Sequence, residues 1–319
     1  MDKTKNKLSF HGDGGELFIT YLVNGLLTVI TLGIYRFWAK VKVTKFLYKY
    51  TEFMGERFDY HGTGKELLQG FLKAMGFFIV FLLMAIGINR LLSKLYSEEI
   101  GIIAAYLFAY VLIIIFVPFI MVGRQRYRLS RSSWRNIRFK FSGTAKEFFF
   151  LYIKGVLLSI VTLGFYGPWF RCNIYKYFAE HSQYGNQRFS YSGKGIELFK
   201  IYLKGILLSI ITLGIYFFWF SAELTRYYWD NMSFQDNKFS SEITGGRIFV
   251  TALKSMLLIV FSFGIGFPWA FIWNLRLTLG TISYDGDIDL KQIKADLDKS
   301  ASSLADGIAE ATGAFDFTS

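Results

Sequence analysis

The chain has 319 residues and a formal net charge of +12, and 53% of its residues are hydrophobic and 19% aromatic, with one cysteine and three histidines. This composition excludes a disordered chain, a disulfide-stapled secreted domain and a zinc module built from cysteine and histidine. Positive charge combined with so much apolar and aromatic content favours a membrane and disfavours nucleic acid as a partner.

Six long apolar stretches follow one another along the chain. Each approaches or exceeds the ~20 residues that span a hydrocarbon core. A soluble helical core can explain one such run but not six, so we predict a polytopic, mainly α-helical membrane protein. We do not expect the first stretch to be a cleaved signal peptide, because basic residues and no small-residue cleavage site follow it. The stretches cover residues 17–39, 67–90, 100–123, 148–170, 198–220 and 248–275.

A phrase of Thr-Leu-Gly, aromatic residues and tryptophan recurs at a spacing of about fifty residues. The copies are Thr31–Trp38, Thr162–Trp169, Thr212–Trp219 and the degenerate Ser262–Trp269. Alternating aromatic segments that end in glycine, such as Phe58–Gly62, stand upstream of the apolar stretches and predict short strands with tight turns. The repeating unit is therefore expected to be a short strand, a glycine turn and a helical hairpin.

This spacing predicts about five pseudo-repeats of ~50 residues that pack on one another. The expected repeat membrane domain covers residues 1–286, with units at about 8–57, 58–138, 139–188, 189–238 and 239–286. The second unit carries an insertion and is interpreted as one repeat extended into a full transmembrane hairpin. Residues 287–319 are expected to form an acidic amphipathic helix or a disordered tail.

Two topologies remain open for the shorter units. Each unit can be a single membrane span or a re-entrant hairpin that returns to the side from which it entered. We favour re-entrant hairpins with tips buried in protein, because the positive-inside bias places all the basic segments, and the N-terminus, in the cytoplasm. These segments are residues 39–66, 124–147, 171–197 and 221–247.

Candidate binding residues lie near the expected helix starts. Four lysines recur at equivalent depth, where contact with a lipid headgroup competes with simple snorkelling to the interface. Glycine pairs precede the helix N-termini, where free N–H groups can hold an anion, although a turn without a ligand explains them too. The candidate lipid or anion site therefore comprises Lys73, Lys154, Lys204, Lys254, Gly62, Gly64, Gly193 and Gly195.

Other recurring positions are interpreted as structural. The glutamates complement the helix dipole or form ion pairs, the glycines break the helices, and the tryptophans are interfacial anchors or core residues. These positions are Glu16, Glu66, Glu147, Glu197, Gly33, Gly164, Gly214, Trp38, Trp169, Trp219 and Trp269. Metal-ligand spacing, a nucleophilic triad, a phosphate-binding loop and a paired-carboxylate motif are absent from the sequence, so we expect no enzyme activity, catalytic residue, metal or cofactor.

At these repeats the sequence resembles the YjgN / DUF898 family of bacterial inner-membrane proteins. The matching segments are Gly14–Phe18, Thr31–Lys40, Phe58–Leu67, Thr212–Tyr216 and Arg226–Asn231. The resemblance covers about residues 8–290, and the fifth repeat departs from it by having Arg247 in place of the acidic residue. It implies a location in the bacterial inner membrane and supplies no substrate, reaction or site residues.

These observations predict an integral inner-membrane scaffold or assembly protein that binds anionic lipid. A transporter or channel built from the pseudo-repeats around a cavity is the alternative. The expected partners are membrane lipids, homo-oligomerisation is left open, and nucleic acid is not expected.

Overall fold

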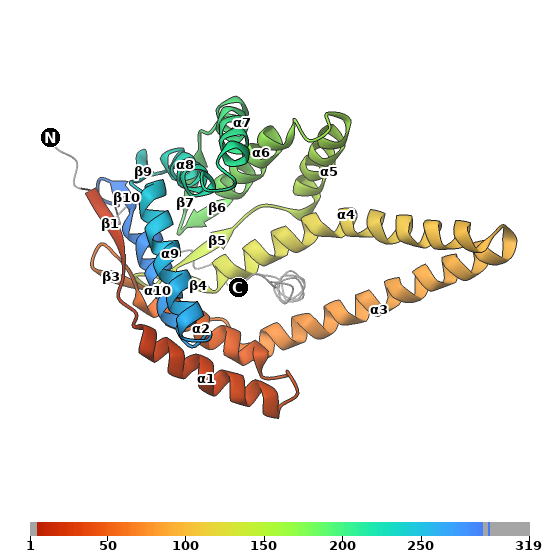
Figure 1. Cartoon of the computed structure of the whole chain (residues 1–319), viewed down its shortest axis with the longest axis horizontal. Coiled ribbons are helices and arrows are strands. Elements are labelled where there is room, and N and C mark those ends of the chain that lie inside the picture. Colours follow the sequence, from red (N-terminus) through yellow and green to blue (C-terminus); the bar gives the residue numbers. More distant parts are fainter. Residues whose placement is uncertain (1–4, 290–292, 294–319) are drawn as a thin grey trace.

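The computed structural model describes residues 5–289 and Ile293 (Figure 1). Within these residues, short strands and pairs of helices alternate along the chain, so that each helical hairpin leaves from one strand and returns into the next. The ten strands described are β1 (Lys5–Phe10), β2 (Thr51–Phe53), β3 (Glu56–Tyr60), β4 (Ser132–Trp134), β5 (Ile137–Phe141), β6 (Ser182–Tyr184), β7 (Gln187–Tyr191), β8 (Met232–Phe234), β9 (Asn237–Ser241) and β10 (Ile282–Asp285).

The helices form five antiparallel pairs within the same described residues. Four pairs are short, with arms of 14–17 residues, and the second pair has arms of 32 and 33 residues. The helices are α1 (Gly14–Ile30), α2 (Arg36–Tyr50), α3 (Gly64–Leu95), α4 (Glu98–Ser130), α5 (Ala145–Val161), α6 (Gly167–Glu180), α7 (Gly195–Ile211), α8 (Phe217–Asp230), α9 (Gly245–Phe261) and α10 (Phe267–Gly280).

The strands form one closed antiparallel barrel in the order β1-β10-β9-β8-β7-β6-β5-β4-β3-β2. Consecutive strands such as β2 and β3 pair through tight turns, and three of these turns hold two consecutive residues at positive φ: Met54-Gly55, Arg135-Asn136 and Gln235-Asp236. Paired positive φ values match the right-handed twist of the flanking strands. Pairing of β1 with β10 closes the barrel and joins the two ends of the described chain.

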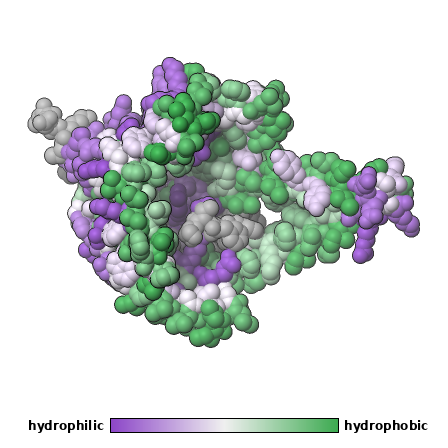
Figure 2. Space-filling view, viewed as in Figure 1, coloured by the Kyte–Doolittle hydropathy of each residue, from purple (hydrophilic) through white to green (hydrophobic). Residues whose placement is uncertain are grey.

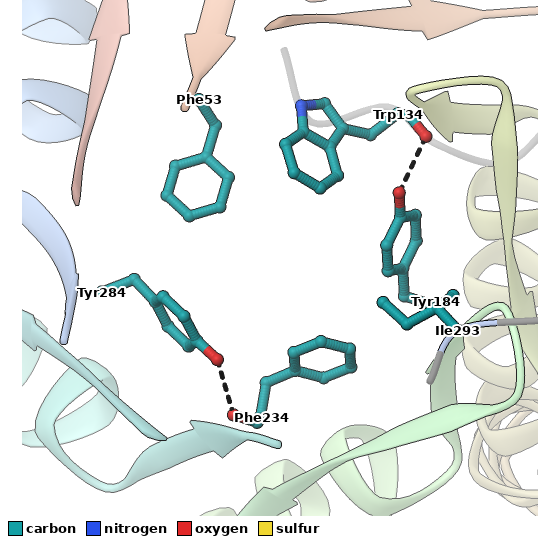
Figure 3. Packing of buried hydrophobic residues seen from close by; sticks show 6 residues of the cluster. All are labelled: Phe53, Trp134, Tyr184, Phe234, Tyr284 and Ile293. Carbon is teal, nitrogen blue, oxygen red and sulfur yellow. Dashed lines mark hydrogen bonds between the residues drawn. The ribbon is translucent and has the colours of Figure 1, made fainter. Parts of the chain in front are cut away.

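Hydrophobic cross-strand pairs fill the lumen of the barrel. An inner ring of buried side chains comprises Phe53, Trp134, Tyr184, Phe234 and Tyr284, and Ile293 packs against it (Figure 3). Each member of this ring stands opposite a second apolar residue in the strand register; the pairs are Leu8–Phe53, Phe58–Trp134, Phe139–Tyr184, Phe189–Phe234 and Phe239–Tyr284. Cross-strand aromatic pairs stabilise a sheet, so these contacts also set the register.

Two tyrosine hydroxyls complete this core. Tyr184 donates to the Trp134 carbonyl at 2.9 Å, and Tyr284 donates to the Phe234 carbonyl at 2.8 Å. Burial raises the pKa of Tyr184 to about 12, so this hydroxyl keeps its proton at neutral pH. The hydrogen bonds satisfy polar groups that would be costly to bury alone.

All five helical hairpins leave the same end of the barrel, because every β-hairpin turn lies at the other end. Neighbouring pairs pack side by side, and α10 contacts α1, so the helices also form a closed ring. In Figure 1 the α3–α4 hairpin projects far beyond the shorter hairpins. The ten described helices, α1–α10, therefore form a ring on one end of the barrel, and we call this ring the helical crown.

The Thr-Leu-Gly phrase forms the tip of three short hairpins, and Ser262-Phe263-Gly264 forms the tip of the fourth. At the first tip Leu32 and Gly33 both have positive φ, and the Gly33 N–H donates to the Thr28 carbonyl at 2.7 Å. The Thr31 hydroxyl oxygen accepts from the Tyr35 N–H at 2.9 Å, which starts the second helix. The first left-handed residue after the helix cap is therefore Leu32, and Gly33 follows it at the second position. Glycine is the more usual residue at the first of these positions.

A pair of glycine variants tests the tip geometry. Gly214 has φ +90° and open space where a β-carbon would stand, whereas Gly76 lies inside α3 with similarly open surroundings. We expect Gly214→Leu to destabilise the fold by about 1 kcal/mol or more through backbone strain, and Gly76→Leu to be neutral or stabilising through helix propensity. Thermal unfolding in detergent measures both, and equal midpoints would contradict a left-handed turn at Gly214.

The prediction of a polytopic, mainly α-helical membrane protein is wrong. The architecture is organised by the closed ten-stranded barrel, and among the described residues only α3 and α4 are long and apolar enough to cross a membrane. The reason is that the tip turns cut four of the apolar stretches into arms of 14–17 residues. A hydropathy count treats each such stretch as one span, although it contains a turn.

The expectation that the hairpin tips are buried in protein is also wrong. Leu32, Leu163, Leu213 and Phe263 stand at the four short tips with 90–96% of their surface exposed. In the hydropathy view, hydrophobic residues cover the helices, whereas hydrophilic residues gather on the barrel side and at the end of the α3–α4 hairpin (Figure 2).

Candidate functional site: a chamber between the hairpins

A cavity of about 830 Å³ lies between the helices above the barrel. Helices α4, α6 and α8 and the lumen-facing phenylalanines of three strands form its walls. The lining residues include Met121, Leu129, Phe139, Phe170, Ile174, Phe178, Phe189, Trp229, Met232 and Phe239. The surface of this chamber is therefore mainly apolar.

Polar groups enter the chamber from α4 and α6. Gln125, Arg128 and Arg171 line it, and no described lining residue is acidic. The Arg128 guanidinium donates to Gln125 Oε1 at 2.7 Å, and the Arg171 guanidinium lies 6.0 Å from the centre of the Tyr228 ring. The chamber thus combines apolar walls with a net positive charge.

The depth of each arginine follows from its distance to the barrel along the helix. Arg128 stands four residues before β4 begins, so it lies at the base of the chamber. Arg171 stands eleven residues before β6, which at ~1.5 Å per residue places it roughly 16 Å from the barrel along the helix. One cation therefore lies at the base and the other near the mouth.

A second hollow of about 300 Å³ continues the chamber along its base. It shares Arg128, Leu129 and Phe139 with the main cavity and reaches Tyr48 on α2 and Phe58 on β3. The lumen of the barrel below is filled by the aromatic core. The chamber is therefore closed at the barrel end and extends toward the hairpin tips.

The four predicted lysines lie outside this chamber. Lys73, Lys154, Lys204 and Lys254 are exposed on the first arms of their hairpins, and none of them is among the chamber-lining residues. Lys204 forms an ion pair with Glu223 at 3.1 Å. The structure does not bring these lysines together, and a lipid contact at each of them stays a prediction.

The predicted glycines lie where aromatic rings press against the backbone. A β-carbon on Gly64 would overlap the Trp38 ring, and one on Gly195 would overlap the Trp169 ring. Gly62 and Gly193 stand equally close to the rings of Tyr60 and Tyr191. Close packing explains why these positions are glycine, whether or not an anion binds there.

The same contact places the recurring tryptophans between neighbouring hairpins. Trp38, Trp169, Trp219 and Trp269 each pack on the first residue of the next hairpin's first helix; those residues are Gly64, Gly195, Gly245 and Gly14. The last of these contacts joins the end of the helical crown to its beginning. The tryptophans therefore serve as packing residues of the helix ring.

The glutamates connect the start of one helix with the end of its partner. Glu66 pairs with Arg131 at 3.1 Å, accepts from the Tyr127 hydroxyl at 3.0 Å and caps its own helix through Thr63. Glu16 accepts from Tyr50 at 2.7 Å, and Glu147 lies 4.0 Å from His181. Glu197 occupies the same first turn in α7.

The residues that line the chamber were not among the predicted site residues. Arg128 and Arg171 were counted only as members of basic segments, and the phenylalanines only as strand markers. A usable signal was present, because Phe139, Phe189 and Phe239 recur at a spacing of fifty residues. They lie on strands whose alternating pattern indicates one buried face.

Fold and site together define a membrane-associated barrel protein with two candidate spanning helices and an apolar, positively charged chamber. The chain belongs to the DUF898 family, described as a bacterial protein of unknown function, whose model matches residues 5–193, 186–237 and 218–311. This agrees with the resemblance inferred from the repeats.

Curated relatives support an inner-membrane location. The inner membrane protein YjgN of Escherichia coli K12 is 28% identical over 164 residues, which are 51% of this chain and 38% of the relative. YjgN of Salmonella typhimurium LT2 is 31% identical over 160 residues, 50% of this chain and 37% of the relative. The matched segments thus span well under half of these relatives, and no solved structure matches the chain.

Proposed function

We propose that this protein is an inner-membrane scaffold that inserts its four short hairpins into the cytoplasmic leaflet and gathers anionic lipid there. Helices α3 and α4 cross the bilayer and anchor it. The barrel, the basic segments and the N-terminus lie on the cytoplasmic side, in line with the positive-inside bias. A channel along the barrel axis is disfavoured by the filled lumen.

The exposed apolar tips carry this proposal. A leucine in a left-handed conformation costs about 1–2 kcal/mol, and glycine or asparagine is the usual residue there. Leu163 and Leu213 make up little of this cost by packing, because they are at least 90% exposed. Insertion into lipid supplies the missing stabilisation, since each large apolar side chain gains about 1.5–3 kcal/mol on leaving water.

The length of the short hairpins supports partial insertion. The 17 residues of α7 extend about 25 Å at ~1.5 Å per residue, less than the ~30 Å hydrocarbon core, and its first turns remain beside the barrel. The polar ends of α3 and α4, with Ser97, Glu98 and Glu99, suit the opposite surface. In this arrangement only the α3–α4 hairpin reaches both surfaces of the membrane.

Spin-label accessibility tests the insertion. In a Cys172→Ser background, single cysteines replace Leu213 at a tip and Ser190, an exposed residue on β7. In lipid nanodiscs we expect the label at position 213 to collide with oxygen more than with a water-soluble nickel complex, and the label at 190 to show the reverse. Equal nickel access at the two positions would reject tip insertion.

The same background tests orientation. A cysteine replacing Ser97 should react with an impermeant maleimide added to whole cells, whereas one replacing Ser190 should react only in inverted vesicles. Reaction of Ser190→Cys with maleimide added to whole cells would place the barrel on the outer side of the membrane and contradict the proposed topology.

A further inference from the structure

We propose that the chamber between α4, α6 and α8 binds one anionic phospholipid of the cytoplasmic leaflet. Its phosphate lies at the base beside Arg128 and Gln125, and its acyl chains run along the apolar walls toward the hairpin tips. This inference rests on the proposed function, because it requires the hairpins to lie in that leaflet.

The size of the chamber fits a ligand. Its volume of about 830 Å³ lies within the ~300–1,000 Å³ of typical binding sites. The hollow beyond Arg128 adds about 300 Å³ at the base, where a headgroup needs room. In Figure 2 hydrophobic residues cover the hairpins that surround this space.

The chemistry of the lining selects an amphiphile. Phe170, Ile174, Phe178 and Met121 cover the walls, so a hydrophilic anion such as free phosphate would leave most of the chamber without a suitable partner. A neutral hydrocarbon would instead leave Arg128 facing apolar surroundings. A phospholipid has apolar acyl chains that suit the walls and an anionic phosphate that suits Arg128.

Arg128 has the hydrogen-bonding capacity that a phosphate needs. Its guanidinium carries five N–H donors, and the hydrogen bond to Gln125 is the contact described for them. Arginine binds phosphate through paired, charge-assisted hydrogen bonds. No described lining residue is acidic, so a carboxylate of the lining does not compete for it.

The direction of the chamber agrees with a lipid of this leaflet. Its base lies at the barrel, on the proposed cytoplasmic side, and its mouth lies toward the exposed apolar tips. A lipid of the cytoplasmic leaflet has its headgroup and tails in this order, and that leaflet carries the anionic lipids that attract basic residues. Arg171 nearer the mouth adds to the positive potential without lying at the phosphate.

Native mass spectrometry of protein released from nanodiscs of equal parts phosphatidylethanolamine and phosphatidylglycerol tests the site. Gly167 lines the chamber and has open space where a β-carbon would stand, so Gly167→Trp should fill the space without a backbone clash. Gly25→Trp is the matched control, since Gly25 is equally open and does not line the chamber. A second variant, Arg128→Gln, removes the charge.

We expect the wild type and Gly25→Trp to retain one phosphatidylglycerol, and Gly167→Trp to lose it. Arg128→Gln should reduce the preference for phosphatidylglycerol over phosphatidylethanolamine about tenfold, since charge-assisted hydrogen bonds are lost. Thermal midpoints close to that of the wild type would confirm that both variants fold. The charge variant keeps the test valid if Gly167→Trp fails to fold.

Two results would overturn the chamber site without contradicting the proposed function. One is unchanged lipid retention and selectivity in Gly167→Trp and Arg128→Gln. The other is loss of phosphatidylglycerol in Lys154→Ala/Lys204→Ala alone, which would move lipid to the outer lysines and leave the proposed function intact. A wild type that retains no phosphatidylglycerol would contradict lipid gathering altogether, as well as the chamber site.

Discussion

Replacing Trp134 by alanine should destabilise the protein by about 3–5 kcal/mol, the usual cost of removing a large buried aromatic side chain. Only 2% of Trp134 is exposed. Its ring lies 5.5 Å from that of Phe53 and 5.6 Å from that of Tyr184, measured between ring centres. Its loss would open a cavity in the middle of the barrel, where Tyr184 also donates to the Trp134 carbonyl.

Thermal unfolding of purified protein in detergent measures this effect. Trp273→Ala is the control, because Trp273 is 38% exposed on α10 and lies outside the barrel core. Tyr184→Phe should give a smaller loss of about 0.5–1.5 kcal/mol, since it removes one hydrogen bond and keeps the ring. Equal destabilisation by Trp134→Ala and Trp273→Ala would show that the barrel core does not carry the stability of the fold.

Gly245→Ala should destabilise the helical crown by about 1–3 kcal/mol, the range for overpacking. A β-carbon there would overlap the Trp219 ring and would lie 2.6 Å from the Trp219 Cα. Because this second atom belongs to the backbone, a change of rotamer cannot relieve the clash. The variant would push α8 and α9 apart at the contact that joins their hairpins.

The next residue supplies a matched control. Gly246 lies in the same helix, one position along, and a β-carbon there would meet only open space. Gly246→Ala should therefore stabilise the protein by up to about 1 kcal/mol through helix propensity. Opposite shifts of the thermal midpoint are the expected result, and a stabilising shift for both variants would refute the packing of Trp219 on Gly245.

Local sequence signals were sufficient to locate the tip turns and several strands. The Thr-Leu-Gly phrase encodes the turn through neighbouring atoms, since the Thr31 hydroxyl and the Gly33 N–H bond to residues no more than five positions away. The aromatic alternation at Phe58 and Tyr60 likewise indicated β3. Such features depend on bonds within one turn, so periodicity and spacing reveal them.

For the glycines at the helix starts, the sequence revealed the recurring positions but only one of the two reasons for them. Their spacing marked Gly64 and Gly195 as special, and free N–H groups at a helix start were one reason for it. The close approach of Trp38 and Trp169 is a second reason, and it depends on the next hairpin in the ring. A single sequence does not indicate which residue of one unit meets which residue of another.

Barrel closure and the chamber were decided only by the tertiary structure. Strands β2, β4, β6 and β8 have three residues each and begin where a helix ends, so they lack the length that makes a strand visible in sequence. Their stability comes from pairing with strands on both sides, and β1 and β10 pair across almost the whole described chain, Lys5 with Asp285 and Asn6 with Tyr284. Arg128 and Arg171 face the same space because the closed barrel orients α4 and α6 inward, whereas local sequence specifies only the helices that carry them.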